Sequence, residues 1–170
     1  MEIERKFLIK SLNLDHLPDD HREVDISSYY LMGFDKVEEA RIAAHEDEYG
    51  VKFWLVKKKK REGISRREIV DELTFREIVD ELTFREFLSL YDTKIDDESH
   101  PIHKTRFMFW EDDVLFELDV FEDTYLTLLE VELQSEDQEV VIPEWLDVIR
   151  EVTDEEAFYS RNIARKLFSG

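Results

Sequence analysis

The first residues of the chain combine acidic and basic side chains at a spacing of two. Glu2, Glu4 and Lys6 occupy alternate positions in the segment Met1–Leu8. In an extended strand, alternate side chains point to the same face, so these three would lie side by side. Two carboxylates beside an ammonium group suggest a site for a divalent cation and the anion that it carries. Metal-bound phosphates are the first candidate for that ligand.

The same alternation returns in three later segments, each with two charged residues two positions apart. The pairs are Lys104 and Arg106, Glu117 and Asp119, and Glu130 and Glu132. Carboxylates clustered without metal or cations would repel one another and have raised pKa values. Arg and Lys donors suit the oxygens of a phosphate chain, and carboxylate oxygens suit Mg²⁺ or Mn²⁺. The pattern therefore predicts a polar interior that binds phosphates and a divalent ion.

Composition narrows the setting in which such a site would work. The chain has 170 residues, 42% of them hydrophobic, with no Cys, four Gly and three Pro, which indicates one domain without a flexible linker. The 43 acidic and 23 basic residues give a formal charge of -20. This charge argues against non-specific binding to nucleic acid or a membrane surface. We expect a cytoplasmic protein whose partner is a small molecule.

Apolar and polar residues alternate along eight segments, which predicts strands. The segments are Glu2–Ile9, Ser28–Phe34, Glu39–Ala43, Val51–Lys58, Ile64–Val70, His103–Trp110, Val114–Phe121 and Thr127–Leu133. Helical signals are found at Thr83–Leu90, Pro143–Arg150 and Asp154–Phe168. We expect an α+β fold that is mostly antiparallel, with an eight-stranded tunnel-like barrel and a few flanking helices.

One segment is repeated without change. Residues Arg67–Phe75 read the same as residues Arg76–Phe84, which indicates a recent or an engineered duplication. Each copy supplies the first part of a Thr-x-x-Glu capping box, at Thr74 and at Thr83. We expect the first copy to complete a strand, and the second to extend the next helix backwards or to form a solvated loop between strand and helix. No functional role is assigned to the repeat.

The order of the motifs resembles the CYTH or triphosphate tunnel metalloenzyme superfamily, and in particular its small bacterial inorganic tripolyphosphatases. The resemblance covers nearly the whole chain. It rests on Glu2-Ile-Glu4-Arg-Lys6, Tyr30-Leu31, Glu39-Ala-Arg41-Ile, Phe53-Trp-Leu-Val-Lys57, Gly63-Ile-Ser-Arg66-Arg-Glu68, Lys104-Thr-Arg106-Phe, Phe116-Glu117-Leu-Asp119, Glu130-Val-Glu132, Pro143-Glu-Trp145 and Tyr159-Ser-Arg-Asn162.

The resemblance implies a role for each matched residue in the hydrolysis of a triphosphate, first of all inorganic tripolyphosphate, by in-line attack of water. The implied ligands of Mg²⁺ or Mn²⁺ are Glu2, Glu4, Asp119, Glu130 and Glu132, assisted by Glu117 and Glu68. The implied phosphate-binding residues are Lys6, Arg41, Arg66, Lys104 and Arg106. Lys57 and Tyr30 are the implied pair that helps to activate water.

Two departures from the family pattern leave the reaction open. Ala43 stands where the family usually has a second Arg, and Val70 stands where it often has a Glu, which also weakens the role of Glu68. A class IV-type adenylyl cyclase, a thiamine triphosphatase and a non-catalytic polyphosphate- or nucleotide-binding module remain alternatives. The metal, and the choice between monomer and homodimer, are not determined by the sequence.

Overall fold

The computed structural model describes residues 3–60 and 75–170, which form two compact units. Unit 1 contains residues 1–25 and 104–155, and unit 2 contains residues 26–103 and 156–170. Each unit is therefore built from two separate stretches of the chain. The expectation of one domain over residues 1–170 stays a prediction.

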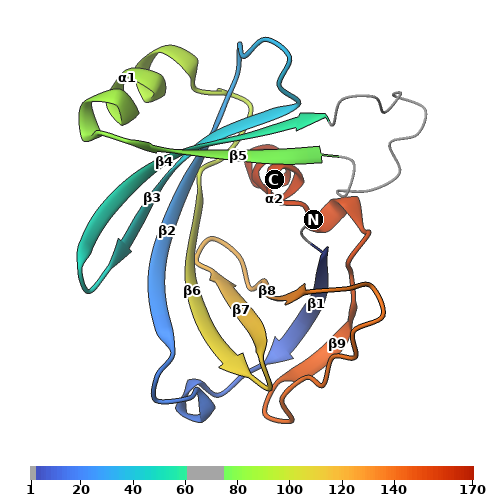
Figure 1. Ribbon diagram of the computed structural model, residues 1–170. Coiled ribbons are helices and arrows are strands. Elements are labelled where there is room, and N and C mark those ends of the chain that lie inside the picture. Colours follow the sequence, from blue (N-terminus) through green and yellow to red (C-terminus); the bar gives the residue numbers. More distant parts are fainter. Residues whose placement is uncertain (1–2, 61–74) are drawn as a thin grey trace. The chain divides into compact units, whose positions relative to one another are not determined.

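Nine strands and two α-helices make up the two units (Figure 1). Unit 1 holds β1 (Ile3–Ser11), the short 3-10 helix η1 (Leu14–His16), β7 (Val114–Phe121), β8 (Thr127–Leu133) and β9 (Asp147–Glu151). Unit 2 holds β3 (Glu39–Asp47), β4 (Gly50–Lys60), β5 (Phe75–Leu82), α1 (Phe84–Lys94), the 3-10 helix η4 (Glu156–Phe158) and α2 (Ser160–Ser169). Strands β2 (Arg22–Leu31) and β6 (Ile102–Glu111) run from one unit into the other.

The fold is α+β and mostly antiparallel, as expected, but its sheet is not a closed eight-stranded barrel. The strand order is β5-β4-β3-β2-β6-β7-β8-β1-β9. Strand β1 pairs with β8 along one edge and with β9 along the other, through pairs such as Phe7 with Leu129 and Phe7 with Glu151. Both edges of β1 are thus occupied, and the order ends with β9 instead of returning to its start.

Strand β9 was expected to be part of a helix over Pro143–Arg150, and that prediction was wrong. The amide of Leu146 donates to the carbonyl of Pro143 over 3.1 Å, which closes a single turn, and the strand begins at Asp147. The guanidinium of Arg5 in β1 binds both carboxylate oxygens of Glu151 at 2.8 Å. Pairing with the edge of β1 therefore outweighs the weak helical signal of this segment.

Unit 1 has an apolar core on one face of its strands. Alternate residues point to that face, so Phe7 of β1, Phe116 of β7 and Val131 of β8 belong to one cluster of buried side chains. Leu129 and Val131 are fully buried. The opposite face of the same strands carries the charged pairs that the sequence analysis singled out.

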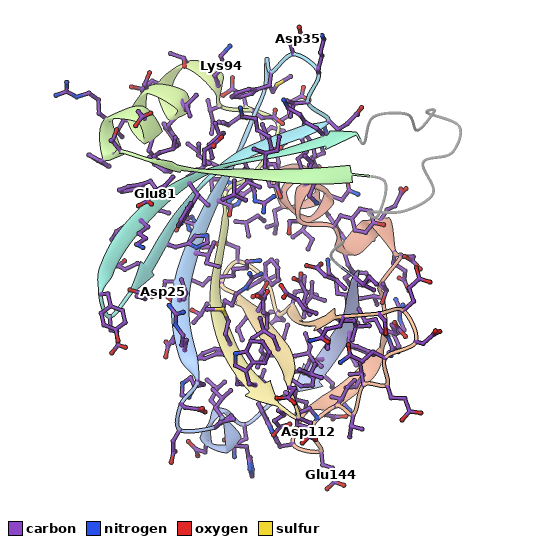
Figure 2. All side chains as sticks on the ribbon, viewed as in Figure 1. Asp25, Asp35, Glu81, Lys94, Asp112 and Glu144 are labelled. Atoms are coloured by element: carbon purple, nitrogen blue, oxygen red, sulfur yellow. The ribbon has the colours of Figure 1, made fainter. Side chains whose placement is uncertain are left out.

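A two-residue turn joins β6 to β7, two neighbouring strands of this core. Between β6 and β7, Asp112 and Asp113 both have positive φ, at 47° and 62°, and Glu111 pairs with Val114. Positive φ at both central residues is typical of the hairpin turns that match the twist of a sheet. Figure 2 shows Asp112 at the end of this hairpin.

Unit 2 has its own core, formed where α1 packs on β3 and β4. Phe87 of α1 joins Ile42 and Leu55 in one buried cluster, and its ring centroid lies 4.8 Å from that of Phe53. In α2, Ile163 and Ala164 are buried. No helix in the described part of the chain is long and apolar enough to cross a bilayer.

The second copy of the repeated segment forms strand β5, so the expectation that it extends the helix or forms a loop was wrong. Ile78 pairs with Lys57, and Leu82 pairs with Phe53. Thr83 then caps α1: its hydroxyl accepts from the amide of Glu86 at 3.2 Å, and the Glu86 carboxylate accepts from the amide of Thr83 at 3.0 Å. Because the strand and the capping box adjoin, this copy completes both. Residues 67–74 of the first copy and the expected strand Ile64–Val70 lie outside the described residues.

The two copies allow a matched test of this assignment. We expect Thr83→Ala to reduce the free energy of unfolding by about 1 kcal/mol, because it removes the hydroxyl that caps α1. Thr74→Ala removes the equivalent residue of the first copy and should change stability less. Urea unfolding followed by circular dichroism measures both variants. A larger loss for Thr74→Ala than for Thr83→Ala would contradict the assignment of β5 to the second copy.

Candidate functional site

Charged side chains gather on the face of the unit 1 strands that lies opposite the apolar core. We call this surface the polar face of unit 1. It carries Glu4, Lys6, Lys104, Arg106, Glu117, Asp119, Glu130 and Glu132. Lys6, Lys104, Glu117 and Asp119 are buried, with exposed fractions of 1–8%. Eight of the predicted site residues thus share one face.

Cross-strand pairing arranges these residues in rows. In one row, Glu4 lies opposite Glu132, which lies opposite Leu115. In the next row, Lys6 lies opposite Glu130, which lies opposite Glu117. Side chains directly opposite each other have Cβ atoms about 5 Å apart, so each row is a set of contacting neighbours.

The guanidinium of Arg106 lies at the centre of the polar face. Its Nε donates to Oδ1 of Asp119 at 2.7 Å, and its Nη2 donates to Oδ2 at 2.9 Å, which makes a two-pronged ion pair. Its Nη1 lies 3.0 Å from Glu117, and its Nη2 lies 3.8 Å from Glu130. One cation therefore interacts with three carboxylates.

Two lysines complete the network. The ammonium of Lys104 donates to Oδ2 of Asp119 at 2.6 Å, and the ammonium of Lys6 lies 3.5 Å from Oε1 of Glu130. All of these groups have less than a quarter of their side-chain surface exposed. At such burial, charged pairs interact more strongly than they would in water, and isolated charges would be costly.

The pKa values follow from this arrangement. Burial alone would raise the pKa of Asp119, but Lys104 and Arg106 outweigh it and hold that pKa well below its ordinary value. Burial raises the pKa of Glu117 from 4.5 to about 7; Arg106 opposes the rise, and Glu130, Asp119 and Glu132 add to it. The two neighbouring carboxyl groups of β7 thus differ in charge near neutral pH.

The polar face has more carboxylates than cations, and this excess fits a divalent ion. Glu4 and Glu132 occupy directly opposite positions, so two carboxylates meet on this side of the sheet. Carboxylate oxygens are the ligands that Mg²⁺ and Mn²⁺ prefer. Within residues 3–60 and 75–170, however, no three acidic or histidine side chains are gathered closely enough to hold a metal. The predicted ligand Glu2 lies outside those residues.

Unit 2 has a polar face of its own, which carries Tyr30 and Arg41. Ala40 and Ile42 pack in the α1 core, so Arg41 between them points to the other face, where its Nη1 lies 3.4 Å from Glu39. Tyr30 is 1% exposed, and its hydroxyl has no hydrogen-bond partner among the described residues. Burial raises the pKa of Tyr30 above its ordinary value. The hydroxyl therefore stays protonated near neutral pH.

Lys57 does not lie on this polar face. It pairs with Ala40 and alternates with Leu55, both in the α1 core, and its ammonium lies 5.7 Å from the ring centroid of Phe34. The next residue, Lys58, pairs with Glu39 and points to the same face as Arg41. The structure thus does not bring Lys57 together with Tyr30. The alternation of Phe53 and Leu55 in the sequence is the signal that would have selected Lys58.

Two further predicted residues lie outside the described part of the chain. These are Arg66, expected to bind phosphate, and Glu68, expected to assist at the metal.

Comparison with known proteins places this fold in a class that includes a triphosphatase. No family model and no curated protein matches the chain. Among solved structures, it is similar over 97% of its length to the inorganic triphosphatase NE1496, with 27% identity, a TM-score of 0.61 and 95% of that chain covered. A second structure of NE1496 gives 28% identity and the same TM-score, with 97% of this chain and 98% of that one covered.

A more distant structure shares the fold alone. The PH1819 protein from Pyrococcus horikoshii OT3 is 19% identical, with a TM-score of 0.54, over 81% of this chain and 80% of that one. The chain therefore has the fold of an inorganic triphosphatase over nearly its whole length, at modest identity.

The raised pKa of Glu117 predicts a pH dependence of stability. The folded protein keeps a proton on Glu117 up to about pH 7, whereas the unfolded chain releases it near 4.5. This contribution to stability is therefore fully present below pH 4.5 and is lost as the pH rises through 7. Glu117→Gln should remove this loss. From pH 5 to pH 8, the free energy of unfolding of the variant should therefore rise by on the order of 2 kcal/mol relative to that of the parent.

Urea unfolding at the two pH values with EDTA present measures this difference. Glu144→Gln, an exposed carboxylate that Figure 2 shows at the outside of unit 1, is the matched control and should follow the parent. Parallel pH curves for Glu117→Gln and the parent would show that Glu117 is ionised throughout this range.

Proposed function

We propose that the protein is a metal-dependent triphosphate phosphohydrolase of the triphosphate tunnel metalloenzyme superfamily, and that inorganic tripolyphosphate is its substrate. The observation that carries the proposal is the polar face of unit 1, on which buried Lys6 and Lys104 and partly buried Arg106 lie among five carboxyl groups. The similarity to the inorganic triphosphatase NE1496 over nearly the whole chain supports it.

The cations of the polar face of unit 1 are suited to bind a phosphate chain. Lys6, Lys104 and Arg106 are donors without acceptor capacity, and their burial strengthens each charge-assisted hydrogen bond to a phosphoryl oxygen. Arg41 keeps the phosphate-binding role that the family resemblance implies, and Lys58, which shares its face, is proposed in place of Lys57.

Glu4, Glu130 and Glu132, together with Glu2, are proposed to hold the divalent ion. Glu4 of β1 and Glu132 of β8 lie opposite each other. Glu130 is two residues before Glu132 on β8 and belongs to the adjacent row. When bound, Mg²⁺ or Mn²⁺ would neutralise phosphate charge and favour attack by water on a terminal phosphorus. The protein's contribution is to orient the phosphate chain with fixed cations, which lowers the cost of reorganisation during reaction.

Phosphate release from tripolyphosphate with Mg²⁺ or Mn²⁺ tests this function directly. We expect metal-dependent release, and a loss of about 100-fold or more in Glu130→Gln, which keeps the side chain's size but removes its charge. ATP and thiamine triphosphate, assayed in parallel, rank the alternative substrates, and cyclic AMP formation distinguishes a cyclase. Tight metal-dependent binding of tripolyphosphate without phosphate release would instead indicate a binding module.

Adjacent lysines of β4 provide a second, internally controlled test. Lys58→Ala should reduce kcat/KM for tripolyphosphate by about 10- to 100-fold, because it removes a charge-assisted contact. Lys57→Ala is the control and should leave kcat/KM nearly unchanged, since Lys57 points to the α1 core. A larger loss of kcat/KM in Lys57→Ala than in Lys58→Ala would show that Lys57, not Lys58, takes part in the reaction.

A further inference from the structure

Asp119 is more deeply buried than any other charged residue of the polar face of unit 1. It is 1% exposed and lies directly opposite Arg106 on the neighbouring strand. Three donors converge on its carboxylate: Arg106 Nε on Oδ1 at 2.7 Å, Arg106 Nη2 on Oδ2 at 2.9 Å, and Lys104 Nζ on Oδ2 at 2.6 Å. Both oxygens are therefore engaged by cations of the protein itself.

The position of Asp119 along the sheet separates it from Glu4 and Glu132, whereas Glu130 lies opposite Glu117, two residues from Asp119. Glu132 lies opposite Leu115, which precedes Asp119 by four residues on β7. Four residues of a strand span about 13 Å. The other neighbour of Asp119, across β8, is the apolar Leu128. A metal held between Glu4 and Glu132, with ligand distances of about 2 Å, would thus lie far from the Asp119 carboxylate.

The remaining guanidinium nitrogen of Arg106 points to another residue of the polar face. Asp119 occupies Nε and Nη2, whereas Nη1 faces Glu117 at 3.0 Å. Two cations as close to one carboxylate as Lys104 and Arg106 would repel each other without it, and both would seek solvent. Asp119 holds them inside the protein, with their remaining donors directed at the polar face.

We infer that Asp119 is a positioning residue that holds Lys104 and Arg106 ready for an anionic ligand, and that it is not a ligand of the metal. The inference rests on the proposed function for the identity of that ligand as a phosphate chain. It replaces the role that the family resemblance assigned to Asp119, and it leaves Glu4, Glu130 and Glu132 as the metal carboxylates of the described residues.

Separate affinities for the metal and for the anion test this inference. Calorimetry of the full-length protein measures Mn²⁺ alone, and then tripolyphosphate alone with EDTA present. Asp119→Asn should weaken tripolyphosphate binding about tenfold or more, because the two cations lose their common anchor. It should leave the Mn²⁺ affinity within about twofold of the parent, because both oxygens of Asp119 are engaged by Arg106 and Lys104.

Glu132→Gln is the matched variant with the opposite expectation. It should weaken Mn²⁺ binding about tenfold or more, and should not weaken tripolyphosphate binding in EDTA. A merely structural role of Asp119 would lower thermal stability without splitting the two affinities in this way. Equal loss of Mn²⁺ affinity in Asp119→Asn and in Glu132→Gln would overturn the inference and restore Asp119 as a metal ligand.

The parent protein provides a second measurement that needs no variant at Asp119. Carboxyl carbon-13 shifts during a Mg²⁺ titration should move for Glu132 and stay constant for Asp119. Movement of the Asp119 resonance together with that of Glu132 would overturn the inference even if Asp119→Asn does not fold. Failure of the parent to bind tripolyphosphate would instead overturn the proposed function. The Mn²⁺ calorimetry and the Mg²⁺ titration use no tripolyphosphate, so they would still test whether Asp119 is a metal ligand.

Discussion

The strict alternation of side chains along β1, β7 and β8 is the constraint on which the structure depends. Leu129 and Val131 are fully buried on one face, while Glu130 between them points to the other. A shift of one residue in the pairing would exchange the faces and bring carboxylates into an apolar core. Core packing therefore holds the charged residues in register, and the fold and the site share one sequence pattern.

The ion network of the polar face is stable only as a set. Removing one partner of a buried pair leaves an uncompensated charge and usually costs several kcal/mol, whereas well-packed apolar residues can replace a whole pair with little loss. Stability alone would therefore not require Lys104, Arg106 and Asp119 to be charged. Their charge, on a face that also carries Glu117 and Glu130, is what the proposed binding of an anion would require.

The sequence predicted the faces of unit 1 because its strands have a clear period of two. Glu4, Lys6, Glu130 and Glu132 lie together as their spacing indicated. The bidentate contact of Asp119 could not be inferred, since side-chain spacing defines a face but not which neighbours meet on it. The role of Lys57 came from the family resemblance alone, whereas the alternation of Phe53 and Leu55 places Lys58 on the face of Arg41.

Long-range pairing explains the remaining differences. Strand β9 depends on the free edge of β1, more than a hundred residues earlier, so local signals at Pro143 favoured a helix. The two identical copies give identical local signals, and only the register with β4 and the adjoining cap distinguish the second from the first.

The identity of the copies has a consequence for the gene. Removal of nine consecutive codons starting at any point from Arg67 to Arg76 yields one and the same shorter protein. That shorter protein would still contain a segment that ends in Glu-Leu, as β5 does. The segment would be followed by the N-cap Thr and by Phe-Arg-Glu, with which α1 begins. Loss of either copy would therefore leave the residues of β5 from Arg76 onwards and of the start of α1 unchanged.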